Sequence, residues 1–350
     1  MMDILILGRS LASLTAAWIL CEKGIQPIIC GPSSRSMRRI ALNASTVELI
    51  ETLFGIHLAE NESARWIHRR RMIGWGNKQD APLEWPSLAI EANALTADID
   101  RTLVQRFGDQ VTFATNFPLQ EQALVIDTIG PHHPRYRNPT GRLTFGRRAA
   151  TACMLRTTRP FDEVLVERTA DSWLFLLPAM MDCWTLYVVT AAQDPDPEDS
   201  IVKAIESSSL RGEVADRTPA EPWHSVAPVL HHPLATKNRI RAGEAAFTFD
   251  PLCGDGAGYA IRSGVLASTV AADVIHQELR GLEYYQFRLN RTFRAHLQAC
   301  REYYAGWNTP DWRHEVDSMR VGVAFLTDAM PRDLLAAAAP SMVGTLQWGL

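Results

Sequence analysis

The first thirty residues hold a strand, a turn, a helix and a second strand in close succession. The run "ILIL" is wholly apolar from Ile4 to Leu7, as expected of a central parallel strand that is buried on both faces. Apolar residues then recur at helical spacing from 11 to 23, and Gly24 suits the end of a helix. "IQPIICG" has the composition of another strand. The chain therefore begins with a β-α-β unit, which requires a parallel sheet with helices packed on it.

The turn inside this unit departs from the dinucleotide-binding pattern G-x-G-x-x-G. Gly8 occupies the first position, but Ser10 and Ser13 replace the other two glycines. Serine at 13 still permits close packing of helix on strand, whereas serine at 10 either hinders a pyrophosphate or donates a hydrogen bond to it. The second strand ends in "CGPS", without the acid that usually binds a ribose. The unit predicts an α/β fold more strongly than it predicts a nucleotide site.

The middle of the chain alternates helices with short strands. Asn43 or Ser45 caps one expected helix, and Thr96 caps a second that ends at Gly108. The apolar strand "ALVID" at 123–127 leads into Thr128-Ile129-Gly130. Alternation and turn residues then predict an antiparallel sheet from the segments "ATACMLRTTRP", "EVLVERTADSWLFLLP" and "CWTLYVVT". From residue 262 onward, the pattern is mostly helical.

A glycine-rich loop precedes one of these helices, in "GEAAFTFDPLCGDGAGYAI" at 243–261. Glycines alternate at 254, 256 and 258, where an apolar helix begins. Glycine lets a backbone approach a flat ligand closely, and a helix N-terminus offers unpaired N–H donors and positive partial charge. The loop therefore predicts a site for a planar, partly anionic group.

This stretch resembles the C-terminal flavin motif of FAD-dependent monooxygenases and the related tryptophan-halogenase-like superfamily, and "DTIG" resembles the family's Asp-Ala-Thr-Gly motif. The resemblance implies FAD as cofactor, with Glu244 in place of the family's Asp at the ribitol. It names no general base and implies that five residues lie next to the flavin, namely Pro251, Cys253, Gly254, Asp255 and Gly256. The implied cofactor-binding residues are Gly8, Ser10, Leu11, Ala12, Ser13, Arg39, Asp127, Gly130, Gly243, Glu244, Asp250, Pro251, Gly254, Gly256, Ala257 and Gly258.

Within the superfamily, the "FTFDPL" segment and the length of 350 residues are similar to the flavoproteins that mature tryptophylquinone cofactors of partner oxidases and dehydrogenases. That similarity implies hydroxylation of a tryptophan in a partner protein by a flavin C4a-hydroperoxide, with O₂ and with NAD(P)H or a separate reductase as electron source. True tryptophan halogenases are longer, and Phe175 replaces a tryptophan of their motif. The alternatives are a small-molecule hydroxylase or reductase, and a flavoprotein-fold chaperone or binding subunit that has lost tight FAD binding.

The resemblance also implies a division of the chain. The expected fold is α/β, with a Rossmann-like FAD-binding domain of the glutathione-reductase type, an inserted antiparallel substrate sheet and C-terminal helices. The expected ranges are 1–65, 95–150 and 235–282 for the FAD-binding domain, 66–94 and 151–234 for the substrate side, and 283–350 for the helices.

Composition excludes several other classes of function. A net charge of −4 argues against a nucleic-acid or membrane-surface partner, and no apolar run approaches the length of a membrane span. Six cysteines without a CxxC pair suit reduced thiols in a cytoplasmic protein and no metal site.

Several polar and aromatic residues carry two interpretations. The runs Arg69-Arg70-Arg71 and Arg147-Arg148 are expected on the solvated surface. The pairs His132-His133 and His231-His232 are expected in surface turns rather than in acid–base roles. Open choices remain for Arg38 and Arg39 (FAD contact or solvent), Cys253 (redox role or packing), and Trp173 and Phe175 (ring neighbours or strand core).

Overall fold

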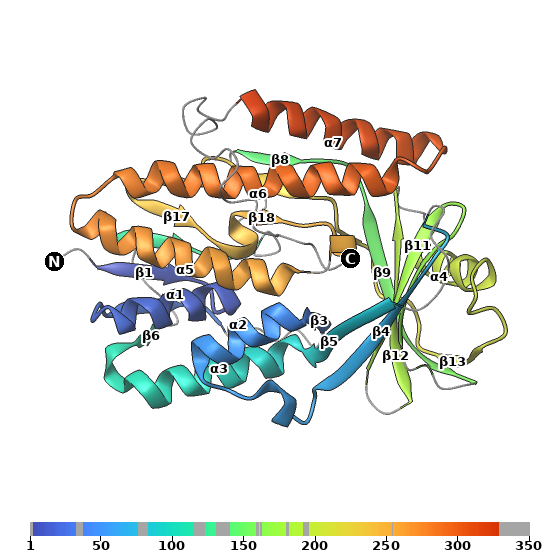
Figure 1. The fold of residues 1–350 in the computed structure, drawn as a ribbon, viewed down its shortest axis with the longest axis horizontal. Coiled ribbons are helices and arrows are strands. Elements are labelled where there is room, and N and C mark those ends of the chain that lie inside the picture. The colour runs from blue at the N-terminus through green and yellow to red at the C-terminus, as the bar shows by residue number, and fades with distance from the viewer. Residues whose placement is uncertain are drawn as a thin grey trace.

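The computed structural model describes residues 3–32, 38–75, 83–114, 123–130, 141–158, 161, 163–179, 182–191, 196–253 and 255–328. In that part of the chain, three sheets and seven α-helices form two adjoining layers of structure, with the parallel sheet and its helices on one side and a large sheet on the other (Figure 1).

The first sheet is parallel apart from one edge strand. Its order is β16-β17-β7-β1-β2-β6, and only β16 pairs in the antiparallel sense. The predicted β-α-β unit is confirmed, because helix α1 (Leu11–Glu22) connects the parallel strands β1 and β2. The strands are β1 (Ile4–Leu7), β2 (Pro27–Cys30), β6 (Thr112–Ala114), β7 (Leu124–Asp127), β16 (Ala235–Thr236) and β17 (Arg239–Arg241).

The second sheet contains the predicted antiparallel strands. Its order is β13-β9-β12-β11-β10-β4-β5-β3, with β14 paired to β9. The strands are β3 (Arg39–Asn43), β4 (Arg65–Ile73), β5 (Leu83–Glu91), β9 (Ala149–Thr157), β10 (Glu163–Arg168), β11 (Ser172–Pro178), β12 (Cys183–Thr190), β13 (Val214–Arg217) and β14 (His224–Ser225). The exact domain ranges stay a prediction, although pairing places β3 in this sheet beside β5.

Three short strands, β8 (Arg142–Thr144), β15 (Val229–His231) and β18 (Phe247–Thr248), form the third sheet in the order β18-β15-β8. The remaining helices are α2 (Ala44–Phe54), α3 (Ala92–Phe107), α4 (Pro197–Glu206), α5 (Gly256–Ile275), α6 (Arg280–Tyr304) and α7 (Pro310–Asp328). In Figure 1, α6 runs alongside both the parallel layer and the large sheet, and α7 lies on α6.

Local chemistry explains where the helices begin and end. The Asn43 side chain accepts a hydrogen bond from the Thr46 N–H at 2.8 Å, so Asn43 is the N-cap of α2. Gly55 ends that helix in the left-handed region, with φ of 66°. The predicted cap at Thr96 is wrong. Helix α3 begins at Ala92, and the Thr96 hydroxyl donates to the Ala92 carbonyl inside the helix.

The two faces of strand β11 separate two hydrophobic cores. Trp173 and Leu177 belong to the large core that also contains residues of β1, α5 and α6. Leu174 and Leu176 point to the opposite face, where a smaller core lies beneath α4. The fold is therefore a mixed α/β architecture whose large sheet is covered on both faces at β11. No helix in the described ranges is long and apolar enough to span a membrane.

Candidate functional site

Three chain segments converge at the carboxyl edge of the parallel sheet. Gly8, directly after β1, has φ of 102°, and a Cβ there would lie 2.6 Å from Thr128 Oγ1. The Gly8 N–H donates to the Cys30 carbonyl at 2.8 Å, and the Thr128 N–H donates to the Leu7 carbonyl at 2.8 Å. Glycine is required at position 8 by both its positive φ and this crowding.

The two serines of the turn hydrogen-bond within the turn itself. The Ser10 N–H donates to Ser13 Oγ at 2.5 Å, and that hydroxyl donates back to the Ser10 carbonyl at 2.8 Å. The Ser10 hydroxyl donates to Thr128 Oγ1 at 3.3 Å. Ser10 has φ of −121°, a conformation open to any residue, so the fold does not need glycine there. The first-turn N–H groups of Leu11 and Ala12 still lack an intrahelical acceptor, as in any helix.

The predicted motif residue Asp127 faces protein rather than a cavity. It is fully buried at the end of β7, and its Oδ2 accepts two hydrogen bonds from Arg239, at 2.5 and 3.1 Å. Its Oδ1 accepts from the Ile129 N–H at 3.2 Å. The Asp127–Arg239 ion pair ties β7 to β17. The hydrogen bond from the Ile129 N–H to Asp127 holds the turn that follows β7.

That turn meets the 3-10 turn at Gly243–Ala245. A Cβ on Gly130 would lie 2.5 Å from Glu244 Oε2, and one on Gly243, where φ is 57°, would lie 2.8 Å from Ala12 Cβ. The residues on both sides of Glu244 are buried, but Glu244 itself is exposed and lines a cavity. Its carboxylate is thus presented beside the backbone of Gly130.

The glycine loop contributes some of its residues to the same cavity and buries others. Pro251, Gly256 and Ala257 line the cavity, and a Cβ on Gly256 would meet nothing within 4 Å. Gly258 is instead packed, because a Cβ there would lie 2.3 Å from Asp255 Oδ1. Gly254 lies outside the described residues. The same is true of the Cys253 side chain, although its backbone closes the turn Pro251–Cys253.

Asp255 and Asp250 have structural partners. Asp255 is the N-cap residue of α5; it accepts from the Thr46 hydroxyl at 2.7 Å and pairs with Arg262 at 2.7 Å. Asp250 is 1% exposed, pairs with Arg148 at 2.7 Å and accepts from the Tyr304 hydroxyl at 2.9 Å. Of the predicted site residues of this loop with described side chains, Asp250 and Asp255 therefore hold the loop in place, while Pro251 and Gly256 line the cavity.

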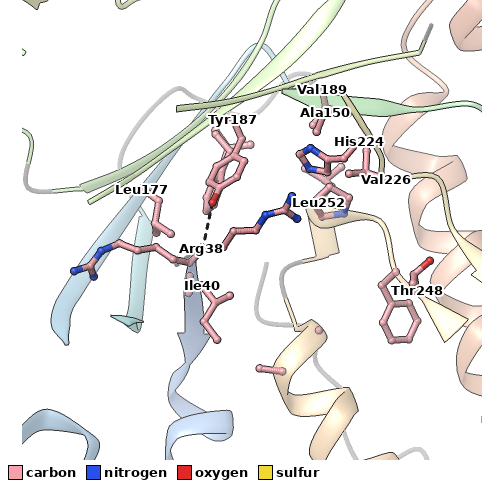
Figure 2. A pocket seen from close by; sticks show the side chains of 18 of the residues that line it. Arg38, Ile40, Ala150, Leu177, Tyr187, Val189, His224, Val226, Thr248 and Leu252 are labelled. Carbon is pink, nitrogen blue, oxygen red and sulfur yellow. Dashed lines mark hydrogen bonds between the residues drawn. The ribbon is translucent and has the colours of Figure 1, made fainter. Parts of the chain in front are cut away.

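The cavity has a volume of about 380 Å³ and lies between this loop and the large sheet. In Figure 2, Tyr187 and Leu177 project from the strands of the sheet toward Arg38 and Ile40 at the start of β3. The Tyr187 hydroxyl donates to the Arg39 carbonyl at 3.4 Å, and burial raises the pKa of Tyr187 above its usual value. Apolar lining with a few polar groups is typical of a small-molecule or cofactor site.

Strands of the large sheet and of the three-stranded sheet contribute further cavity-lining residues, which the sequence pattern did not single out or left open. Trp173 and Phe175 pack in the core and also line the cavity, so core packing is confirmed and their place beside a flavin ring stays a prediction. Arg39 lines the cavity, is 8% exposed, and donates to the Ser63 carbonyl at 2.8 Å. Newly found lining residues are Arg70, Trp85, Arg142, Tyr187, Val189 and His224. The available signal was strand alternation, because every second residue of β4, β11 and β12 faces one side.

Three expectations of solvent exposure are wrong. Arg70 is 6% exposed, Arg148 is 0% exposed, and His231 is 1% exposed. Each lies in or next to a strand with a buried face, so its side chain points into the protein. His132 and His133 lie outside the described residues.

The fold has close counterparts among solved structures. No protein-family model matches the chain, and no curated protein matches it by sequence. The peptidyl tryptophan dihydroxylase QhpG, essential for tryptophylquinone cofactor biogenesis, aligns over 89% of this chain and 78% of its own, at 17% identity and a TM-score of 0.68. The myxobacterial chondrochloren halogenase CndH aligns over 96% and 90%, at 15% identity and a TM-score of 0.74.

A third similar structure is the p-nitrophenol 4-monooxygenase PnpA from Pseudomonas putida, which aligns over 94% of this chain and 97% of its own, at 14% identity and a TM-score of 0.70. At such identities, structural likeness establishes architecture and not activity. The chain has the fold of flavin-dependent halogenases and monooxygenases.

Proposed function

We propose that this protein is an FAD-dependent monooxygenase that hydroxylates an electron-rich aromatic ring, and that its substrate is a tryptophan side chain of a partner protein whose quinone cofactor it helps to form. The observation that carries the proposal is the cavity between the N-terminus of α5 and the large sheet. The likeness to a peptidyl tryptophan dihydroxylase supports the choice of substrate.

The residues around the cavity suit FAD. The Gly8 turn and the first-turn N–H groups of α1 would hold the pyrophosphate, and the exposed carboxylate of Glu244 would accept hydrogen bonds from ribitol hydroxyls. The open face at Gly256 and the first-turn N–H groups of α5 would receive the polar edge of the flavin ring. The fit is weaker at the phosphate end, because Ser13 already accepts from the Ser10 N–H.

FAD supplies the redox chemistry when bound: in its reduced form, with two electrons from NAD(P)H or a separate reductase, it activates O₂, so that one oxygen atom enters the substrate and the other leaves as water. The chain positions and shields this chemistry. Phe175, Leu177 and Val189 form an apolar wall that excludes water from the reacting ring.

The first test is the flavin itself. Purified protein, or protein reconstituted with FAD, should be yellow, with an absorbance maximum near about 450 nm. Gly256→Ala should weaken FAD binding at least about tenfold by filling the space at the ring edge, while the melting temperature stays unchanged or rises slightly, because the added methyl meets no atom of the described residues within 4 Å. Protein that stays colourless after reconstitution would support the alternative of a binding or chaperone subunit.

The second test is the reaction. Holoenzyme supplied with NADH or a chemical reductant, O₂ and a tryptophan-containing peptide of the partner should add one or two oxygen atoms to the indole, as detected by mass spectrometry of the digested peptide. Oxygenation of small aromatic compounds without any oxygenation of the peptide would favour the small-molecule hydroxylase instead.

A further inference from the structure

Arg70 is a buried cation without a counter-ion among the described residues. It lies in the middle of β4 and is 6% exposed. In the same part of the chain, no group forms a hydrogen bond with its buried Nε and Nη2 atoms, and no carboxylate forms an ion pair with it. Its neighbour Arg71 differs, because its Nε lies 2.6 Å from the Glu163 carboxylate.

Such an arrangement is costly for the protein alone. A guanidinium stays protonated in proteins, and burying an unpaired charge costs several kcal/mol even after relaxation. Buried polar groups are almost always hydrogen-bonded, so an exception in a native fold needs an explanation. A ligand with an anionic oxygen would supply the missing acceptor.

Arg70 lies at the wall of the cavity, so a ligand that supplies the missing hydrogen-bond acceptor would bind in the cavity. Arg70 lines the cavity between the large sheet and the glycine loop, and its guanidinium carbon lies 5.0 Å from the ring centroid of Trp85, which lines the same cavity. Contact with the ring face restrains the guanidinium plane while leaving its N–H groups to bind an acceptor. Trp173, on the same sheet, has a buried indole N–H that also lacks a partner.

The charges along the cavity favour an anion. Four arginines line it, against one carboxylate, Glu244, which lies at the other wall next to Gly130. Charges of one sign in a largely apolar cleft attract ligands of the opposite sign. The arginines are Arg38, Arg39, Arg70 and Arg142.

We propose that Arg70 binds an oxyanion of the substrate, and that the substrate is an aromatic ring, such as an indole, that carries a carboxylate. This inference rests on the proposed function, since it assigns the substrate class of the same site. The carboxylate belongs either to a free aromatic acid or to an acidic residue beside the tryptophan of a protein substrate.

The test compares binding of an anionic and a neutral probe. Isothermal titration calorimetry with the purified full-length protein would use indole-3-propionate and 3-methylindole. The wild-type protein should bind the carboxylate at least about tenfold more tightly, as expected for a charge-assisted hydrogen bond in a desolvated site. Arg70→Met should abolish this preference and leave 3-methylindole binding unchanged.

A matched control separates this role from a structural one. Arg71→Met removes a neighbouring arginine that already has a carboxylate partner, and should keep the carboxylate preference. Arg70→Met should melt at the same temperature as wild type or higher, because it removes an unpaired buried charge. The proposal would be overturned by a wild type that shows no carboxylate preference with either the indole pair or peptides that carry Trp-Glu and Trp-Gln, or by an undiminished preference in Arg70→Met.

Two further arms resolve the source of the oxyanion and the link to catalysis. Blocked peptides with Trp-Glu and Trp-Gln repeat the comparison for a protein substrate, and discrimination in either probe pair supports the role of Arg70. Because binding is measured without turnover, the two proposals fail separately. Colourless protein that discriminates the probes contradicts the enzyme alone, whereas a yellow enzyme that oxygenates neutral indoles without discrimination contradicts the oxyanion site alone.

Discussion

His231 is a buried imidazole, and no group of the described residues forms a hydrogen bond with either of its ring nitrogens. Burial, together with the nearby cations Arg241 and Arg142, lowers its pKa to about 4, and Asp127 only partly opposes this shift. The unfolded chain, with a histidine pKa of 6.5, therefore binds more protons than the folded protein between these two values. Stability contributed by His231 is complete above pH about 6.5 and is lost as the pH falls toward 4.

The expected loss amounts to at most about 3 kcal/mol at the acid end, from 1.36 kcal/mol per pKa unit. Urea unfolding at a series of pH values between about 4 and 7 measures it. His231→Leu replaces the imidazole by an apolar side chain that does not titrate, and should therefore flatten this part of the pH profile. The same acid slope in both proteins would show that other groups cause it.

At the scale of secondary-structure elements, α1 and α5 cross in close contact at a glycine. A Cβ on Gly264 would lie 2.6 Å from the Ala12 carbonyl oxygen and 2.9 Å from Thr15 Cβ. Gly264→Ala should therefore push the helices apart and destabilise the protein by about 1–3 kcal/mol. Because Ala12 belongs to the first turn of α1, FAD affinity should fall as well.

Gly256→Ala is the matched control for that variant, since it adds the same methyl to the same helix where no atom of the described residues lies within 4 Å. Chemical denaturation should leave its free energy of unfolding unchanged or slightly higher, because alanine favours a helix more than glycine does. Equal destabilisation of both variants would mean that crowding at the α1–α5 contact does not set the effect.

Adjacent arginines of strand β4 lie in different environments, one buried and one half-exposed. Three consecutive arginines occupy its centre, and successive side chains in a strand point to opposite faces. One of the two faces belongs to the cavity, so Arg70 is buried while Arg71 pairs with Glu163 from a half-exposed position. A run of like charges therefore does not by itself indicate a surface.

At the scale of the whole molecule, one buried ion cluster joins three distant segments. Arg148, just before β9, pairs with Asp250 of the glycine loop at 2.7 Å and with Glu315 of α7 at 2.6 Å. All three side chains are fully buried. Burial raises the pKa of Glu315 despite the neighbouring guanidinium, as expected where two carboxylates share one cation.

Arg148→Met should destabilise the protein by about 3–5 kcal/mol, because it leaves two carboxylates buried without their cation. Equilibrium urea unfolding measures this change. Arg156→Met is the control, because its ion pair with Asp216 is exposed on both sides and should contribute less than about 1 kcal/mol. A small effect at Arg148 would show that water or a protonated carboxyl compensates for the lost charge.

Elements that depend on local pattern were predictable from the amino-acid sequence. The β-α-β unit follows from an apolar run, a helical period and a glycine stop, and the helix after the glycine loop follows from the apolar segment that succeeds the glycines. The antiparallel strands follow from alternation and turn residues. These features involve residues close together in the chain, so their physical causes are visible in the sequence.

Contacts between polar residues could not be predicted in the same way, because they depend on how distant segments pack. Contacts between distant segments bury Arg70 and Arg148. They also link Asp250 to Glu315 of α7 through their shared partner Arg148. The same packing places Gly256 at the wall of the cavity. Burial changes the energy of a charge by several kcal/mol, yet no local pattern reports it. The large sheet therefore lines the part of the cavity for which we propose substrate binding, while the glycine loop lines the part that the sequence had already indicated.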